Sequence, residues 1–79
     1  MNNQNIISKA IWFHRKKSGL TQKQLAEIAG VGKSVIFDIE NGKETVQLDT
    51  LLKILGALNI SFRLDSPIIH LMENENEES

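Results

Sequence analysis

Two short segments with a helical pattern, residues 22–29 and 33–40, are separated by only three residues, Gly30-Val31-Gly32. So short a connection makes the two helices cross at a sharp turn, which needs a residue that tolerates a positive φ angle, and Gly30 supplies it. Helices that cross closely also need a small side chain at their contact, and Ala26 lies there. The pattern therefore predicts two helices packed as one unit around these buried side chains: Leu25, Ala29, Val31, Ile36 and Ile39.

Two further helices are predicted to flank this unit. Residues 6–18 carry apolar side chains at helical spacing, with Asn3 or Asn5 in position to cap the first turn. Residues 48–58 repeat leucine at i, i+3, i+4, i+7 and i+10, which is the strongest such pattern in the chain. Thr21 and Gln24 form the T-x-x-Q pattern of a capping box. The sequence thus predicts an all-α fold of four to five helices, with these additional inward positions: Ile7, Ala10, Ile11, Ile28, Val35, Leu48, Leu51, Leu52, Leu55 and Leu58.

Residues 60–65 have a different period. Ile60, Phe62 and Leu64 alternate with polar residues, as in a half-buried β-strand. A lone strand is not stable, and a chain of helices offers it no partner. We therefore expect a short C-terminal strand that pairs with the strand of a second copy across a two-fold axis. The alternative dimer surface is aromatic and lies on the first helix: Trp12 and Phe13.

Charge separates the end of the chain from the rest. The 79 residues are enough for one domain, and ten acids against nine bases give a net charge of −1. Four of the ten acids lie in residues 73–78, ENENEE, so six acids face nine bases elsewhere, and net charge does not exclude DNA as a partner. We expect residues 1–66 to be the folded domain and residues 67–79 a polar, acidic, disordered tail. The tail serves solubility, or its apolar residues form a docking segment: Ile68, Ile69, Leu71 and Met72.

Composition argues against several chemistries. The chain has no cysteine for a disulfide or a thiolate metal site. No apolar run approaches the roughly 18 residues that span a bilayer, and the start lacks a signal peptide, so we expect a cytoplasmic protein with no membrane partner. Gly32-Lys33-Ser34 looks like the end of a phosphate-binding P-loop, but Glu27 occupies that motif's first glycine position. His14 and His70 have no ligand or carboxylate constellation around them, so we expect no enzyme, metal or cofactor.

The window QKQLAEIAGVGKSVIFDIEN, which begins at Gln22, resembles the helix-turn-helix unit of phage-type repressors. The flanking LTQKQLA, ENGK and leucine-rich helix extend the likeness to residues 3–58. The resemblance implies a sequence-specific DNA-binding transcriptional repressor that inserts the second helix of the unit into the major groove. In that family an arginine seven residues before the first glutamine pairs with a glutamate near the end of the second helix. Arg15 and Glu40 occupy these two positions, so the resemblance also implies an ion pair between them.

By this resemblance, DNA contacts fall to two groups of residues. The exposed face of segment 33–40 presents Lys33, Ser34, Phe37 and Asp38 to the bases. Lys33 can donate to guanine, and Ser34 can reach a base edge or a phosphate. Phe37 either packs on a thymine methyl or folds back onto the protein, and Asp38 either accepts from cytosine or is a solvated residue. Phosphate contacts come from the start of segment 22–29 and the loop after the second helix: Thr21, Gln22, Lys23, Asn41 and Lys43.

A leucine-rich helix, the stretch LNISFRLDSP and a short polar tail, in this order, make the chain similar to the HipB antitoxins. This likeness implies a homodimer on a palindromic operator that represses its own operon and binds a serine/threonine-kinase-like toxin. No motif marks the toxin-contacting surface. Two other functions stay open: a stand-alone or phage-type regulator without a toxin, and a protein-interaction module with residual DNA affinity.

Overall fold

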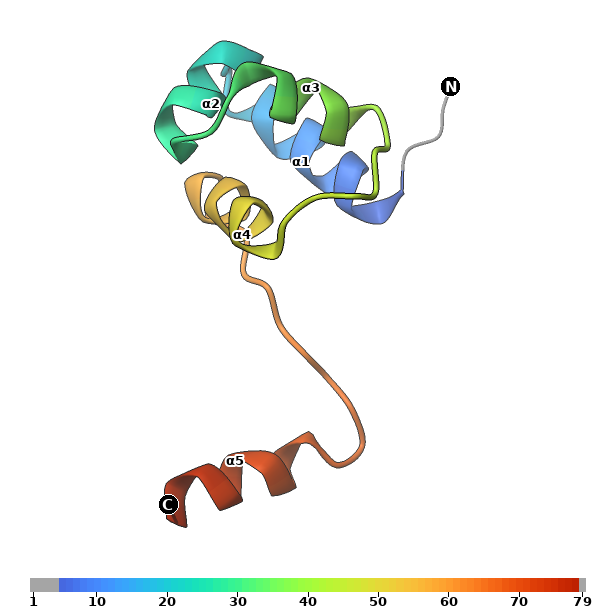
Figure 1. Cartoon of the computed structure of the whole chain (residues 1–79), viewed down its shortest axis with the longest axis vertical. Coiled ribbons are helices and arrows are strands. Elements are labelled where there is room, and N and C mark those ends of the chain that lie inside the picture. Colours follow the sequence, from blue (N-terminus) through green and yellow to red (C-terminus); the bar gives the residue numbers. More distant parts are fainter. Residues whose placement is uncertain (1–4, 79) are drawn as a thin grey trace.

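The computed structural model describes residues 5–78, with side chains as far as residue 74 toward the C-terminus, and this range forms five α-helices and no β-strand. Four helices pack into a small body, and the fifth lies apart at the end of an extended connection (Figure 1). The all-α fold expected from the sequence is confirmed. Within the described range, no helix has the length and apolar character needed to cross a membrane. The helices are α1 Ile6–Lys17, α2 Gln22–Ala29, α3 Lys33–Glu40, α4 Leu48–Ala57 and α5 Ile69–Glu78.

The first three helices begin where the sequence predicts. Asn5 caps α1, because its Oδ1 accepts a hydrogen bond from the Ser8 N–H at 2.8 Å. At α2 the predicted capping box is complete: Thr21 Oγ1 accepts from the Gln24 N–H at 3.0 Å, and Gln24 Oε1 accepts from the Thr21 N–H at 2.8 Å. α3 starts after Gly32, which offers no side-chain cap. Such caps fix helix starts because the first N–H groups have no intrahelical partner.

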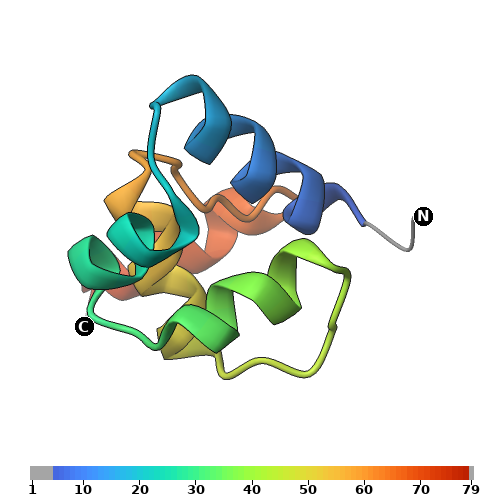
Figure 2. The ribbon, with the colours of Figure 1, turned by 90° about the horizontal axis from the view of Figure 1, so that it is seen from above.

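The turn between α2 and α3 has the predicted geometry. Gly30 ends α2 with φ 75° and ψ 36°, in the left-handed region that side chains disfavour. The Ala26 carbonyl accepts from the N–H groups of Gly30 at 2.9 Å and Val31 at 3.0 Å, which satisfies the end of the helix. Ala26 itself is 3% exposed at the helix crossing. Figure 2 shows how short the connection between the two helices is.

The core lies between the four helices of the body. α2 contacts both α3 and α4, and α1 contacts α3. Ser8 is buried as well, and its Oγ donates to the Ile39 carbonyl at 2.6 Å, which joins α1 directly to α3. The buried apolar residues are Ile11, Leu25, Ala26, Ile36, Ile39, Leu51, Ile54, Leu55 and Leu58.

Four apolar residues predicted to face inward are exposed instead: Ile7, Ile28, Leu48 and Leu52. In their place Ser8 and Ile54 are buried. Each helix of so small a body has neighbours on only one side, so the stripe it buries is narrower than the apolar stripe in its sequence. The outer edge of that stripe is left on the surface.

The chain agrees with the prediction at the end of α4 and differs from it at two places in the C-terminal segment. α4 is followed by Asn59, whose φ of 60° matches the left-handed end predicted for it. Residues 60–66 then form neither helix nor strand in a single chain, because a strand needs a partner. Residues 69–78 form α5, where the sequence analysis expects a polar tail without regular structure. Leu, Met and Glu favour a helix, and its first turn is tied back by the Ile69 N–H, which donates to the Ser66 carbonyl at 3.3 Å.

Candidate nucleic-acid interface

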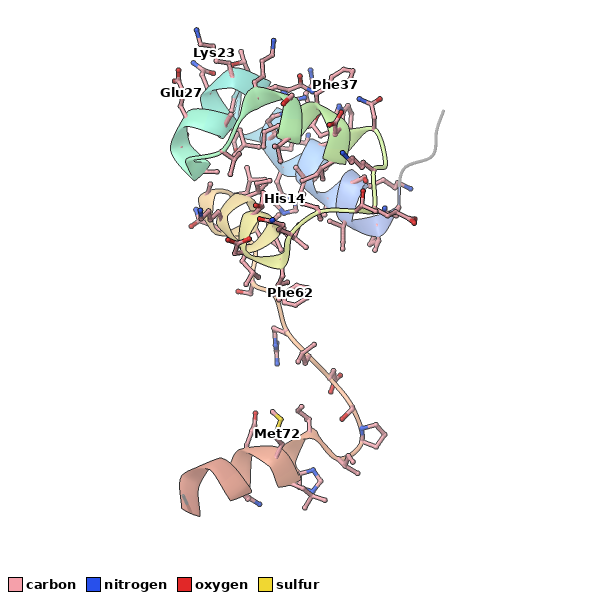
Figure 3. The ribbon with its side chains drawn as sticks, viewed as in Figure 1. His14, Lys23, Glu27, Phe37, Phe62 and Met72 are labelled. Atoms are coloured by element: carbon pink, nitrogen blue, oxygen red, sulfur yellow. The ribbon has the colours of Figure 1, made fainter. Side chains whose placement is uncertain are left out.

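α3 turns one side to the core and the other to solvent. Lys33, Ser34 and Phe37 are exposed, at the spacing i, i+1 and i+4 that places them on one side of a helix. Figure 3 shows Phe37 on the outside of the body, on the same side as Lys23 near the start of α2. The outer side of α3 and the start of α2 thus face the same side of the body.

A buried ion pair joins α1 to α3 behind this surface. The predicted pair is present, because Arg15 Nε lies 2.6 Å from Glu40 Oε2 and Arg15 Nη2 lies 2.9 Å from Glu40 Oε1. The two side chains are 10% and 4% exposed. Arg15 Nη1 also donates to the Leu20 carbonyl at 2.9 Å. This two-pronged contact fixes α1, the α1–α2 turn and α3 relative to one another.

Gln22, the first residue of α2, is tied into the same network. Its Nε2 donates to Glu40 Oε1 at 3.1 Å. An amide carries two N–H donors and a carbonyl, so this bond orients the group and leaves a donor for another partner. The neighbouring backbone N–H groups of the first turn of α2 also lack intrahelical partners. The sequence analysis predicted the pair of Arg15 and Glu40 but missed the contact between Gln22 and Glu40.

The loop after α3 makes its own contacts. Lys43 Nζ lies 3.8 Å from Asp38 Oδ2, with the two side chains 55% and 44% exposed. An exposed pair of this kind is worth about 0–1 kcal/mol, so either member is easily released to another partner. Asn41 Nδ2 donates to the Phe37 carbonyl at 2.8 Å. Asp38 therefore has one cationic neighbour, while its own side chain stays partly exposed to solvent.

Phe37 and the residues expected to form the dimer strand differ in exposure. Phe37 is 54% exposed and is not part of the core. Ile60 packs against the core of its own chain, whereas Phe62 and Leu64 are 51% and 71% exposed. Phe62 and Leu64 are thus the two more exposed members of this set. Among the described residues, no group of three or more side chains is arranged to hold a metal ion.

This arrangement of two helices around a glycine turn has relatives of known class. A helix-turn-helix family model matches residues 14–64. The chain is 42% identical over 61 residues to the uncharacterized HTH-type transcriptional regulator y4mF of Sinorhizobium fredii, which covers 77% of this chain and 80% of the relative. It is 38% identical over 72 residues to the competence pilus inhibition repressor of Acinetobacter baylyi, but these cover 91% of this chain and only 63% of that repressor.

Solved structures give the same result. The chain is similar to the HipA-HipB-O2-O3 complex structure, with 32% identity and a TM-score of 0.68 over 76% of this chain and 84% of the matched chain. It is also similar to the restriction-modification controller protein C.AhdI of Aeromonas hydrophila, with 31% identity and a TM-score of 0.64 over 70% and 83%. On the match of fold, turn and sequence, the chain belongs to the helix-turn-helix family of DNA-binding transcriptional regulators.

Proposed function

We propose that this chain is a dimeric transcriptional repressor that places α3 in the major groove of a palindromic operator. One observation carries the proposal: an exposed outer side of α3 stands beside a Gln22 amide held by the buried Glu40 carboxylate. A groove-reading helix needs free side chains in front and a rigid attachment behind. The ion pair of Arg15 and Glu40 provides that attachment for α3.

Four residues of α3 are proposed to meet the bases. Lys33 donates to guanine O6 or N7, and Ser34 reaches a base edge or a neighbouring phosphate. Phe37 packs its exposed ring on a thymine methyl. Asp38 contributes less, because accepting from cytosine N4 would separate it from Lys43.

The phosphate contacts are proposed to lie on both sides of α3. At the start of α2, the second N–H of the Gln22 amide and the unpaired backbone N–H groups face one phosphate, with Thr21 and Lys23 beside it. Beyond α3, Lys43 and Asn41 face another. Because phosphate contacts release counterions, affinity should fall steeply with salt.

Two copies of the chain are proposed to pair along residues 60–65. Phe62 and Leu64 are half exposed or more, on a segment with unpaired backbone groups. Antiparallel pairing across a two-fold axis would satisfy those groups and cover both side chains. The resulting pair of α3 helices suits a palindromic operator.

The finer assignment is an antitoxin that represses its own operon and binds a kinase-like toxin. Its support is the likeness to HipB, which has been solved in a complex with HipA and O2-O3. A stand-alone regulator is the second candidate, supported by the likeness to a restriction-modification controller protein and to a competence pilus inhibition repressor. A third, a protein-interaction module with residual DNA affinity, is favoured by the exposed apolar side chains outside α3.

A mobility-shift titration on the protein's own promoter at several salt concentrations tests the DNA-binding role. We expect Lys33→Ala to weaken binding by about 5-fold to 150-fold, since a good base contact is worth about 1–3 kcal/mol. Gln22→Ala should weaken binding to specific and unrelated DNA alike. Lys53→Ala, which removes an exposed lysine of α4, is the control. If neither Lys33→Ala nor Gln22→Ala differs from that control, the assigned surface is wrong.

The antitoxin role needs a separate test. Co-expression with the product of the adjacent gene, followed by co-purification on the repressor, should recover a kinase-like protein in a stable complex. A promoter-bound repressor whose neighbouring gene encodes no such protein would instead support the stand-alone regulator.

A further inference from the structure

The outer side of α1 is aromatic and basic. Trp12 is 42% exposed and Phe13 is 50% exposed. With Ile6, Lys9 and Ala10 they line an open hollow of about 310 Å³. Lys17 Nζ lies 5.5 Å from the centre of the Phe13 ring, and the helix sequence IISKAIWFHRKK contains no acid. This surface suits a partner that is both apolar and acidic.

α5 has that chemistry. Its first turn and the residues before it expose apolar side chains, including Ile68, Leu71 and Met72, and the sequence then continues as ENENEE. The helix has ten residues and stands apart from the body (Figure 1), whereas isolated helices shorter than about 12–15 residues are marginal in water. ENENEE holds four acids within six residues, and acids near a helix C-terminus oppose the macrodipole. A basic neighbour would remove these penalties.

The order of the two chemistries also matches along the helix axes. On α1, the aromatic pair Trp12 and Phe13 comes before the basic residues Lys16 and Lys17, and on α5 the pair Leu71 and Met72 comes before the acidic run ENENEE. The two helices therefore carry an apolar part followed by a charged part in the same order, with opposite charges. A parallel alignment brings the apolar parts together and the acidic run toward the basic end of α1.

We propose that α5 of one chain docks on the outer side of α1 of a second copy. The inference rests on the dimer of the proposed function. In an antiparallel pair along residues 60–65, residue 65 of one chain lies beside residue 60 of its partner, and therefore beside the partner's body. α5 begins at Ile69, only a few residues later, whereas its own body lies at the opposite end of the strand (Figure 1). Docking would cover two exposed apolar surfaces that neither chain covers alone.

The single tryptophan of the chain reports on this contact. In the full-length dimer, docking should protect Trp12 from acrylamide quenching. The double variant Leu71→Ser with Met72→Ser should shift its emission to longer wavelength and raise its quenching constant. The matched control is Ile28→Ser, which removes a side chain 59% exposed on α2 and should change neither. Equal Trp12 quenching in the double variant and the wild type would overturn the inference.

Mixed dimers test whether the contact is between chains. A Trp12→Phe chain with an intact α5 is combined with the double variant, so that the only tryptophan faces an intact α5 from the other chain. Protection should return on mixing, and quenching that stays high would place α5 on its own α1 or on the other α5. Sedimentation of the wild type tests the proposed dimer separately from the docking of α5. A monomer would contradict the dimer. A dimer in which Trp12 is not protected would contradict only the docking.

Discussion

The body of residues 5–59 and the segment of residues 60–78 use apolar side chains in opposite ways. In the body they converge on one core, and no buried side-chain N or O atom of the described residues lacks a hydrogen-bond partner. In the C-terminal segment Phe62, Leu64 and Ile68 are all at least half exposed. The body thus has a core of its own, whereas these three side chains of the segment are not buried in the single chain. Substitutions in the two regions should therefore act on different equilibria.

The largest effect should follow Arg15→Ala. Glu40 would then be buried without its cation, and breaking a buried pair from one side costs about 3–5 kcal/mol. Urea denaturation followed by circular dichroism should show this loss in the free energy of unfolding. Arg63→Ala removes an exposed arginine of the C-terminal segment and should change it by no more than about 0.5 kcal/mol. A small loss for Arg15→Ala would mean that the pair does not hold the body together.

A double variant sharpens this result. Arg15→Met with Glu40→Leu removes both charges, and such replacements are often neutral or stabilising. We expect most of the stability to return, while Gln22 loses the acceptor that orients its amide. DNA affinity should therefore stay below that of the wild type in a mobility shift. Full recovery of both properties would show that Glu40 serves stability alone.

Ile54→Ala compares the core with the exposed segment. Ile54 is 0% exposed, so truncating it should cost about 2–5 kcal/mol in the same urea experiment. Leu64→Ala removes an apolar side chain that is 71% exposed in one chain, and we expect little change in the unfolding of the body. Similar losses for both variants would contradict the distinction between the buried core of the body and the exposed side chains of the C-terminal segment.

How far the sequence predicts the molecule follows the same division. The glycine turn and the capping box are local patterns, and the ion pair of Arg15 and Glu40 was implied by the resemblance to phage-type repressors. All three are present in the structure. The exposure of Ile28 and Leu52 was not predicted, because the apolar stripe of a helix does not reveal how many neighbours will cover it. α5 was missed because the acids of ENENEE suggest solvation, although the residues before them are good helix formers. The bond from Gln22 to Glu40 depends on tertiary packing that no local motif encodes.

Thr21→Ala should have a smaller effect that is confined to the body. It removes the acceptor of the Gln24 N–H in the capping box, and losing such a cap typically costs about 1 kcal/mol. Thr45→Ala, at an exposed loop position, is the matched control. The difference in urea midpoint between the two variants measures what the cap contributes to stability. Equal midpoints would indicate that water replaces the lost hydrogen bond at no cost. Because Thr21 is also a proposed phosphate neighbour, DNA affinity should be measured on the same two variants.

Phe62→Lys should have the smallest effect on the body and the clearest effect on assembly. Phe62 is 51% exposed, so a lysine there disturbs no core contact of its own chain. In the proposed dimer, however, two lysines would meet beside a two-fold axis with their charges unpaired, and the chain should sediment as a monomer. Because a dimer is stabilised by mass action, the wild-type urea midpoint should rise with protein concentration, and that of the variant should not. At the lowest concentrations the two midpoints should converge, since the body is the same in both. A variant that remains dimeric would show that the segment 60–65 does not hold the dimer, and would place the contact on Trp12 and Phe13 of α1, either directly or through the docked α5.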